Sequence, residues 1–344
     1  MEIRAFITHK KAEKDSDCQD CFRINAENKS LAVSDGMSQS IFQKKWAEIL
    51  VSAYTDGQGW EPSKEPDNAT VKNVLSGKWK DYVLKRIEEQ RQEGKDRAAD
   101  RNERSLVEGK SAGATFLGVR FSGNRWEGDV LGDTCLIEIE DGEIIRIETS
   151  QNNSSFDNTP DYYDSNNLNS GKGQVKHIKG VLESNKILLL VSDPFSDLFN
   201  EHKKTGSVKE LVEQLFKLGS HKDFVALVDD WREQLEMHND DSTLIIITHD
   251  DSDAFNVTND DSCFITSEKQ CEEKDVALVK KVRECVSENN TEKECEDAKE
   301  FIKDLIECFH VKSCKDKKWN RKHIIGAIRK AIERLLDKYV IKKK

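Results

Sequence analysis

The sequence has no long apolar run and no set of Cys-x-x-Cys pairs that would form a zinc site. No stretch approaches the ~20 apolar residues that a membrane-spanning helix needs, and residues 1–6 contain no apolar signal core. The one Cys-x-x-Cys pair, Cys18 and Cys21, is not followed by a second pair at zinc-site spacing, and the nine cysteines are an odd number. We therefore expect a cytoplasmic protein with free thiols and no stable membrane association.

Hydrophobic residues are also scarce. They make up 36% of the 344 residues, and the mean hydropathy is -0.72, which indicates a core diluted by long solvated loops and a charged helical module. The formal net charge of -11 argues against nucleic-acid binding by the chain as a whole, although residues 312–344 are strongly basic. A chain of this length forms one large domain or two ordinary ones.

Apolar patterns divide the first 250 residues into strands and helices. Predicted strands cover residues 2–8, 21–34, 114–119, 126–131, 135–139, 144–147, 187–192 and 243–249, with an Asp-Gly hairpin turn at 141–142. Predicted helices cover residues 40–54, a segment from residue 79 into the charged stretch 91–110, and residues near 207–218 and 221–237. Polar loops lie at residues 55–70 and 150–174. These elements predict an α+β fold, a central β-sandwich of two sheets flanked by helix pairs.

The character of the chain changes after residue 250. We expect a first domain over residues 1–250, a linker over 251–268 and an all-helical C-terminal module of about three amphipathic helices over 269–344. The cysteines of this part match no zinc template and are interpreted as small buried hydrophobic residues. The basic last helix either packs its apolar stripe inside the module or binds an acidic protein partner, an acidic face of the first domain, or a membrane surface.

Aspartates adjoin apolar runs at four places in the first 250 residues. Asp20 precedes one run, Asp35 and Asp193 each follow one, and Asp240 lies just before the run at 244–247. Strands deliver residues to one edge of a sheet, so these carboxylates can converge on one point. Packed carboxylates repel one another unless a divalent cation lies between them, and hard oxygen ligands select Mg²⁺ or Mn²⁺. The pattern predicts a metal-dependent hydrolytic enzyme.

The Asp-Gly pair at residues 35–36 lies at a predicted strand-to-helix turn. There the Asp35 carboxylate and the Gly36 carbonyl can both face a metal, and Asp35 is the best candidate to bridge two ions. Asp193 and Asp240 would complete one of these ions. Two such ions can activate a water and neutralise a phosphoryl group, so attack on a phosphate then needs mainly positioning and charge stabilisation.

Several further motifs occur in a definite order within residues 3–249. They are His9, Cys-Gln-Asp at 18–20, Ser-Asp-Gly at 34–36, Gly-Ala-Thr at 113–115, Gly-Asp-Thr at 132–134, Ser-Asp at 192–193 with Asp197, and Asp-Asp-Ser-Thr at 240–243. Each motif alone is weak, whereas the ordered set with its apolar flanks is specific. The set resembles that of the metal-dependent type 2C (PPM) serine/threonine protein phosphatases, in particular their bacterial branch.

The resemblance implies a metal centre of two Mn²⁺ or Mg²⁺ ions and a third, loosely held ion. It gives Asp35 the bridging role and places the Gly36 carbonyl on one ion. Asp193 and Asp240 would bind the other ion, and Asp133 would bind the third with Asp193 and with Asp197 as a further candidate ligand. The family fold that it implies, a β-sandwich flanked by helix pairs, agrees with the independent prediction above.

The resemblance also implies the reaction, which is hydrolysis of phosphoserine and phosphothreonine on proteins in signalling. The expected catalytic residues are Asp35, Asp20 as a ligand of metal-bound water, and His9. His9 is either a general acid toward the leaving alkoxide or a surface histidine beside two lysines. The expected partners are a phosphorylated protein and a cognate kinase, with the C-terminal helices available to a further protein partner.

Three departures from the family pattern concern substrate handling. Pro194 replaces the usual Gly after Asp193, Met-Ser-Gln at 37–39 replaces a Gly-rich turn, and no Arg precedes Asp20 at the usual distance. Point charges could come from three lysines instead, Lys10, Lys11 and Lys14. The departures motivate an alternative, a catalytically degenerate phosphatase-fold module that binds phosphoproteins or a small ligand. A scaffold role of the C-terminal module could coexist with either function.

Overall fold

The computed structural model describes residues 1–38, 40–57, 60, 69–150, 160–166, 173–250 and 255–259. All of these residues belong to one compact unit, Met1–Glu268. The predicted helical module over 269–344, and most of the predicted linker over 251–268, lie outside the described residues.

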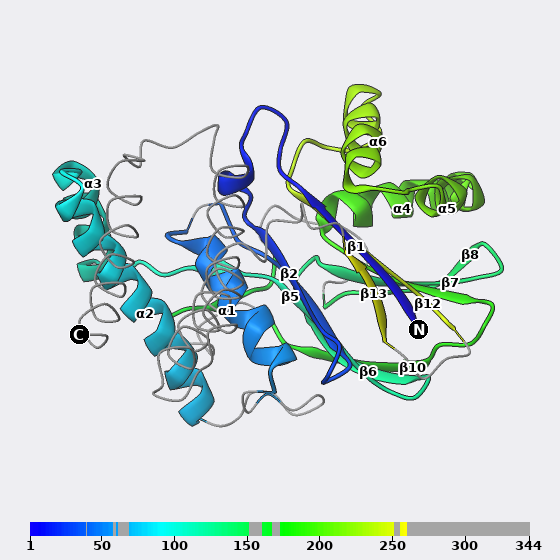
Figure 1. The fold of residues 1–344 in the computed structure, drawn as a ribbon, viewed down its shortest axis with the longest axis horizontal. Coiled ribbons are helices and arrows are strands. Elements are labelled where there is room, and N and C mark those ends of the chain that lie inside the picture. The colour runs from blue at the N-terminus through cyan, green and yellow to red at the C-terminus, as the bar shows by residue number, and fades with distance from the viewer. Residues whose placement is uncertain are drawn as a thin grey trace, which may run out of the picture. The chain divides into compact units, whose positions relative to one another are not determined.

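Two main sheets form the centre of this unit (Figure 1). The six-stranded sheet has the order β13 (Asn256–Asn259), β1 (Glu2–Thr8), β12 (Ser242–Thr248), β11 (Lys186–Val191), β7 (Cys135–Glu140) and β8 (Glu143–Glu148). The five-stranded sheet has the order β10 (Lys176–Val181), β6 (Arg125–Leu131), β5 (Phe116–Ser122), β3 (Ser30–Asp35) and β2 (Asp20–Asn25). A two-stranded ribbon joins β4 (Gly113–Ala114) to β9 (Tyr163–Asp164).

The continuous apolar run of β12 follows from its position, since it is covered on both faces. Ile245 and Ile247 pack between the two sheets with residues of β3 and β5, whereas Leu244 and Ile246 face the opposite way into a second cluster with three helices. Alternate residues of a strand point to opposite faces, so a strand covered on both sides needs apolar residues at every position. The neighbouring strand β11 follows the same rule.

Helices cover the outer face of each sheet (Figure 1). α4 (Asp193–Thr205), α5 (Val208–Phe216) and α6 (His221–Glu233) pack on the six-stranded sheet. α1 (Gln43–Thr55) packs on the five-stranded sheet, and α2 (Ala69–Gln92) packs on α1 and pairs with α3 (Asp96–Val107). The predicted α+β architecture, with two sheets and helices packed on them, is confirmed.

Helix α4 is absent from the sequence-based prediction, which has no helix between residues 193 and 206. Its signals are present in the sequence. Ser192 is the N-cap, Pro194 lies in the first turn, and buried Phe195, Leu198 and Phe199 follow at helical spacing. The αL residue Gly206 (φ 75°) ends the helix.

Other elements also differ from the prediction. The single strand predicted over 21–34 is wrong, because residues 26–29 form a turn between the antiparallel strands β2 and β3. β10 lies in a stretch without a strong apolar pattern because it is an edge strand in which only Ile178 is buried. The charged stretch 91–110 divides at Gly94 (φ 72°) and continues as α3, whose buried residues are Ala99 and Ser105. β13 lies within the predicted linker and pairs in parallel with β1.

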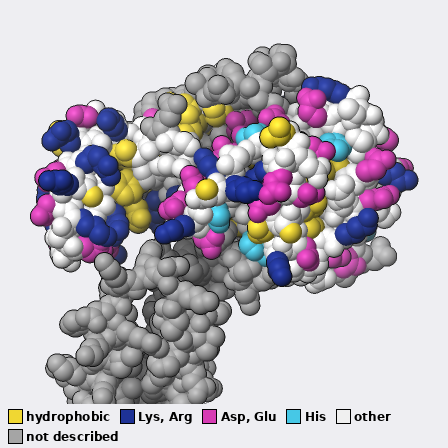
Figure 2. All heavy atoms as spheres, turned by 90° about the horizontal axis from the view of Figure 1, so that it is seen from above, with side chains coloured by type: hydrophobic (Ala, Val, Ile, Leu, Met, Phe, Trp, Pro, Cys, Tyr) yellow, Lys and Arg dark blue, Asp and Glu magenta, His cyan; other side chains and the backbone are white. Residues whose placement is uncertain are grey.

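Charge is mixed over the surface that Figure 2 shows, where the described Asp and Glu side chains alternate with Lys and Arg. In the part of the chain that the structure describes, no helix combines the length and apolar character that crossing a membrane requires.

The sandwich interior provides a direct test of the fold. Leu190 on β11 is 0% exposed and lies between the sheets, so Leu190→Ala should lower the free energy of unfolding by about 2–5 kcal/mol in urea titrations. As a control, Ile145→Ala on β8, where the residue is 45% exposed, should change it by less than about 0.5 kcal/mol. Equal losses in the two variants would contradict this placement of Leu190.

Candidate metal centre

Five aspartates reach one region from different strand ends. Asp20 begins β2 and Asp35 ends β3, and the two are direct partners in the strand register. Asp193 begins α4 directly after β11, and Asp240 lies just before β12, the neighbour of β11. Asp133 lies in the turn between β6 and β7, which joins the two sheets. The strand ends therefore bring together the carboxylates that the sequence singled out.

Burial and mutual repulsion raise the pKa values of three of these aspartates. Burial raises the pKa of Asp35 well above its usual range, and the neighbouring Asp20, Asp193, Asp133 and Asp240 raise it further. Burial, then Asp241 and Asp193, raise the pKa of Asp20 to about 8, although the Thr243 hydroxyl donates to Asp20 Oδ2 at 2.7 Å.

Asp133 shows the same effect. Burial, Asp193, Asp197 and Asp240 raise its pKa to about 7, although a backbone hydrogen bond opposes the shift. The mutual repulsion of these carboxylates means that they form one electrostatic cluster.

Two buried carboxylate oxygens in this cluster have no hydrogen-bond partner. They are Asp20 Oδ1 and Asp133 Oδ1, and the two side chains are 2% and 7% exposed. A buried oxygen left without a donor is costly, and a cation satisfies it as well as a donor does. Carboxylate oxygens that lie close together and repel one another are suitable ligands for a hard divalent cation such as Mn²⁺ or Mg²⁺.

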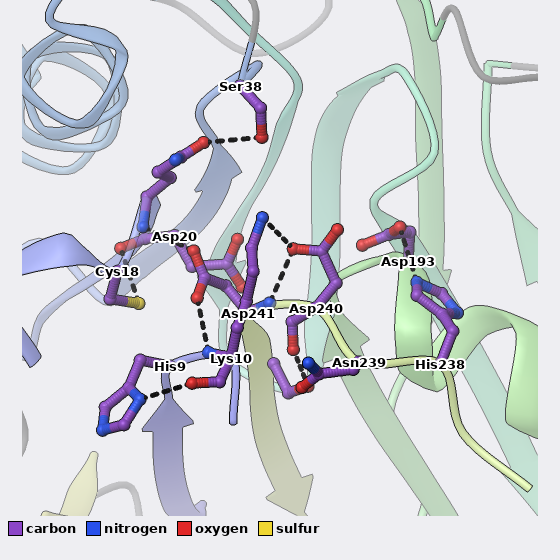
Figure 3. Close-up of polar contacts among 12 residues, drawn as sticks. His9, Lys10, Cys18, Asp20, Ser38, Asp193, His238, Asn239, Asp240 and Asp241 are labelled. Carbon is purple, nitrogen blue, oxygen red and sulfur yellow. Dashed lines mark hydrogen bonds and ion pairs between the residues drawn. The ribbon is translucent and has the colours of Figure 1, made fainter. Parts of the chain in front are cut away.

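Asp241 holds the loop that leads into Asp20. Its two oxygens accept the backbone N–H groups of Lys10 at 2.9 Å and Gln19 at 2.7 Å (Figure 3). The loop between β1 and β2 is thereby fastened to the start of β12. Of the three candidate lysines, Lys10 lies at the cluster, where its Nζ is 2.8 Å from Asp240 Oδ1. Lys11 pairs with Glu233 at 2.6 Å, and Lys14 precedes the short helix η1 (Asp15–Asp17).

The His9 side chain is not brought into the cluster. Its Nδ1 lies 2.7 Å from the Lys10 carbonyl oxygen and its Nε2 lies 3.1 Å from Asp15 Oδ1. Figure 3 shows the ring directed away from Asp193 and Asp240.

Comparison with known proteins decides the family. The family model of protein phosphatase 2C matches residues 9–236, more than half of the chain. The chain belongs to the protein phosphatase 2C family. No curated protein matches the sequence.

Solved structures of bacterial phosphatases are similar to this chain at low identity. The Mycobacterium tuberculosis serine/threonine phosphatase PstP/Ppp is 15% identical, with 72% of this chain and 98% of that chain covered and a TM-score of 0.44. PppA of Pseudomonas aeruginosa, a regulatory component of the type VI secretion system, is 16% identical over 72% and 96% of the two chains, with a TM-score of 0.41. RsbX, solved in complex with magnesium, is 15% identical over 70% and 92%, with a TM-score of 0.36.

The structure accommodates two of the departures from the 2C pattern. Pro194 is the second residue of α4, where a backbone N–H has no partner within the helix, so its missing N–H costs no intrahelical bond. The turn after Gly36 is held by backbone bonds from Met37 N to Gly113 O and from Ser40 N to Met37 O, both at 3.0 Å. Residue 39, part of the same departure, lies outside the described residues.

Gly36 itself has no room for a side chain. A Cβ there would lie 2.9 Å from the backbone carbon of Gln43, 3.0 Å from its oxygen and 3.1 Å from the Gln19 oxygen. The backbone of Gly36 is therefore held closely beside the two strand ends that carry Asp20 and Asp35.

Two residues at the centre were missed by the sequence analysis. His238 contacts Asp193, and its position two residues before Asp240 was the available signal. Arg232, 7% exposed on α6, donates to the carbonyl oxygens of His9 and Asp240 and to the Ser242 hydroxyl. Its signal was a charged residue on the apolar stripe of a predicted helix, next to Trp231.

The raised pKa values predict how stability depends on pH without metal. The unfolded chain releases these protons near pH 4, whereas folded Asp133 and Asp20 hold theirs to about pH 7 and about pH 8. The folded state then binds more protons, so the free energy of unfolding falls as pH rises from about 4 to about 8. Urea unfolding with a chelator should show this fall, and Asp20→Asn should reduce it.

The control for this test is Asp100→Asn, which changes a carboxylate on α3 whose side chain is 64% exposed. It should leave the pH dependence as in the wild type. A wild-type profile with the same slope as that of Asp20→Asn would contradict the raised pKa of Asp20.

Proposed function

We propose that this chain hydrolyses phosphoserine and phosphothreonine on proteins at a centre of two Mn²⁺ or Mg²⁺ ions. The observation that carries the proposal is the convergence of mutually repelling aspartates, of which Asp20 and Asp133 are buried and each have one oxygen without a donor. Family membership supports the reaction class. A phosphorylated protein is the proposed substrate, and the kinase that modifies it is the proposed functional counterpart.

The residues divide into the ligands of two ions and the ligands of a third. Asp35 would bridge the first two, with the Gly36 carbonyl on one and Asp193 and Asp240 on the other, while Asp133 would hold the third with Asp193. Bound ions of this kind supply a nucleophile at neutral pH and neutralise charge on the phosphoryl group.

Other residues position these ligands and the substrate. Asp20, fixed by the Thr243 hydroxyl, would orient the attacking water through its free Oδ1. Of the three candidate lysines, Lys10 has its ammonium group at the cluster, so it is our candidate to contact the phosphate as a point charge. The general-acid role of His9 remains a prediction, since its ring contacts Asp15 and Lys10 in this structure.

Substitution of the bridging aspartate tests the proposal. Asp35→Asn should lower the rate of Mn²⁺-dependent hydrolysis of a phosphothreonine peptide by at least about 100-fold. Substitution of a residue that only supports a metal ligand commonly lowers activity or metal affinity by about 10–100-fold, and the loss of a ligand itself should cost at least as much. Asp100→Asn should retain the wild-type rate. Circular dichroism should show that both variants are folded.

The same assay separates catalysis from the alternative of a binding module without turnover. A folded wild-type protein with no metal-dependent turnover would overturn the proposal. An Asp35→Asn variant with the wild-type rate of hydrolysis would show that Asp35 is not a metal ligand of the proposed centre.

A further inference from the structure

His238 occupies a defined position beside two of the proposed metal ligands. It lies in the loop from α6 to β12, between buried Met237 and the aspartate at 240. Its Nε2 is 3.1 Å from Asp193 Oδ2, and Figure 3 shows the ring facing Asp193. One ligand atom each from His238, Asp193 and Asp240 lies within 4.8 Å of the others.

This spacing suits atoms that share one ion. Six-coordinate ions with bonds of about 2.1 Å place neighbouring ligand atoms about 3 Å apart. The separation of 3.1 Å between His238 Nε2 and Asp193 Oδ2 agrees with that value. An imidazole nitrogen is also a common metal ligand in proteins.

The second ring nitrogen has the partner that a metal-bound histidine usually has. His238 Nδ1 lies 3.5 Å from Asp197 Oδ2. Asp193 and Asp197 are four residues apart on α4, so one helix face presents both carboxylates to the two ring nitrogens. Metal-bound histidines commonly direct their other nitrogen to a carboxylate, which fixes the ring orientation.

An independent observation comes from Asp133. Its side chain is 7% exposed and its Oδ1 has no hydrogen-bond partner. Asp193, Asp197 and Asp240 are near enough to raise its pKa by repulsion. A cation held by His238, Asp193 and Asp240 would relieve part of this repulsion.

We propose that His238 is a nitrogen ligand of the ion that Asp193 and Asp240 bind, with Asp197 as the carboxylate that orients its ring. The inference rests on the proposed function for the presence of that ion. A nitrogen ligand favours a transition-metal ion such as Mn²⁺ over Mg²⁺, which prefers oxygen ligands. His238 would thus set which metal this centre prefers.

Pulsed electron paramagnetic resonance on the full-length protein with Mn²⁺ tests the proposal, because it detects a nitrogen bound to the ion. The wild-type signal should carry nitrogen modulation, and His238→Ala should lose it. His238 lies on the surface with its side chain 42% exposed, so the variant should fold. The control, His202→Ala, changes a histidine near the end of α4 that contacts Ser207 and should keep the modulation.

Metal affinities give a second measurement. His238→Ala should raise the Kd for Mn²⁺ at least about tenfold and the Kd for Mg²⁺ by less. Asp197→Asn should keep the nitrogen modulation and raise the Kd for Mn²⁺. If His238 is only a counter-ion of Asp193, the wild type would lack the modulation and His238→Ala would bind Mn²⁺ as tightly or more tightly, which overturns the inference.

The outcomes also distinguish this inference from the proposed function. Metal-dependent hydrolysis by a wild-type protein without nitrogen modulation would overturn the role of His238 alone. Nitrogen modulation without hydrolysis would overturn the proposed reaction and leave the role of His238 in place.

Discussion

Repulsion among buried carboxylates is the constraint on which the rest of the structure depends. Asp20 and Asp35 face each other directly across two paired strands, an arrangement that is unfavourable for like charges. Asp193, after a strand of the other sheet, and Asp133, in the turn that joins the two sheets, add to the repulsion. Such a cluster lowers the stability of the folded protein, so its presence indicates a function. A bound cation would offset the repulsion between the carboxylates.

The scaffold holds these groups together through contacts that do not involve the charges of the proposed metal ligands. The two sheets are joined by a fully buried apolar interior, so their strand ends cannot separate. Asp241 fastens the β1–β2 loop to the start of β12 through two backbone N–H groups. Arg232 joins the ends of β1 and β12 through the carbonyl oxygens of His9 and Asp240. Rigid support of this kind is what a multi-carboxylate centre requires.

The sequence predicted the two-sheet fold and the convergence of Asp35, Asp193 and Asp240 because both depend on local patterns. Strands covered on both faces are continuously apolar, and an aspartate at the end of such a strand is visible without any knowledge of the fold.

β10 could not be found in this way, because an edge strand buries few residues and leaves little apolar pattern. The contacts of His238 with Asp193 and of Arg232 with His9 were missed because these partners are 45 and 223 residues away in the sequence. Helix α4 had local signals that the prediction did not use, namely Pro194 in its first turn and the buried residues that follow at helical spacing.

The central claim is that this cluster is complete only with divalent cations. Calorimetric titration of Mn²⁺ into the metal-free protein at pH 7, in two buffers that differ in ionisation enthalpy, tests it most directly. Because the pKa of Asp20 is raised to about 8, binding should displace protons, and the heat should depend on the buffer. Binding of at least two ions with proton release is the predicted result. An absence of binding, or binding whose heat is the same in both buffers, would contradict the account.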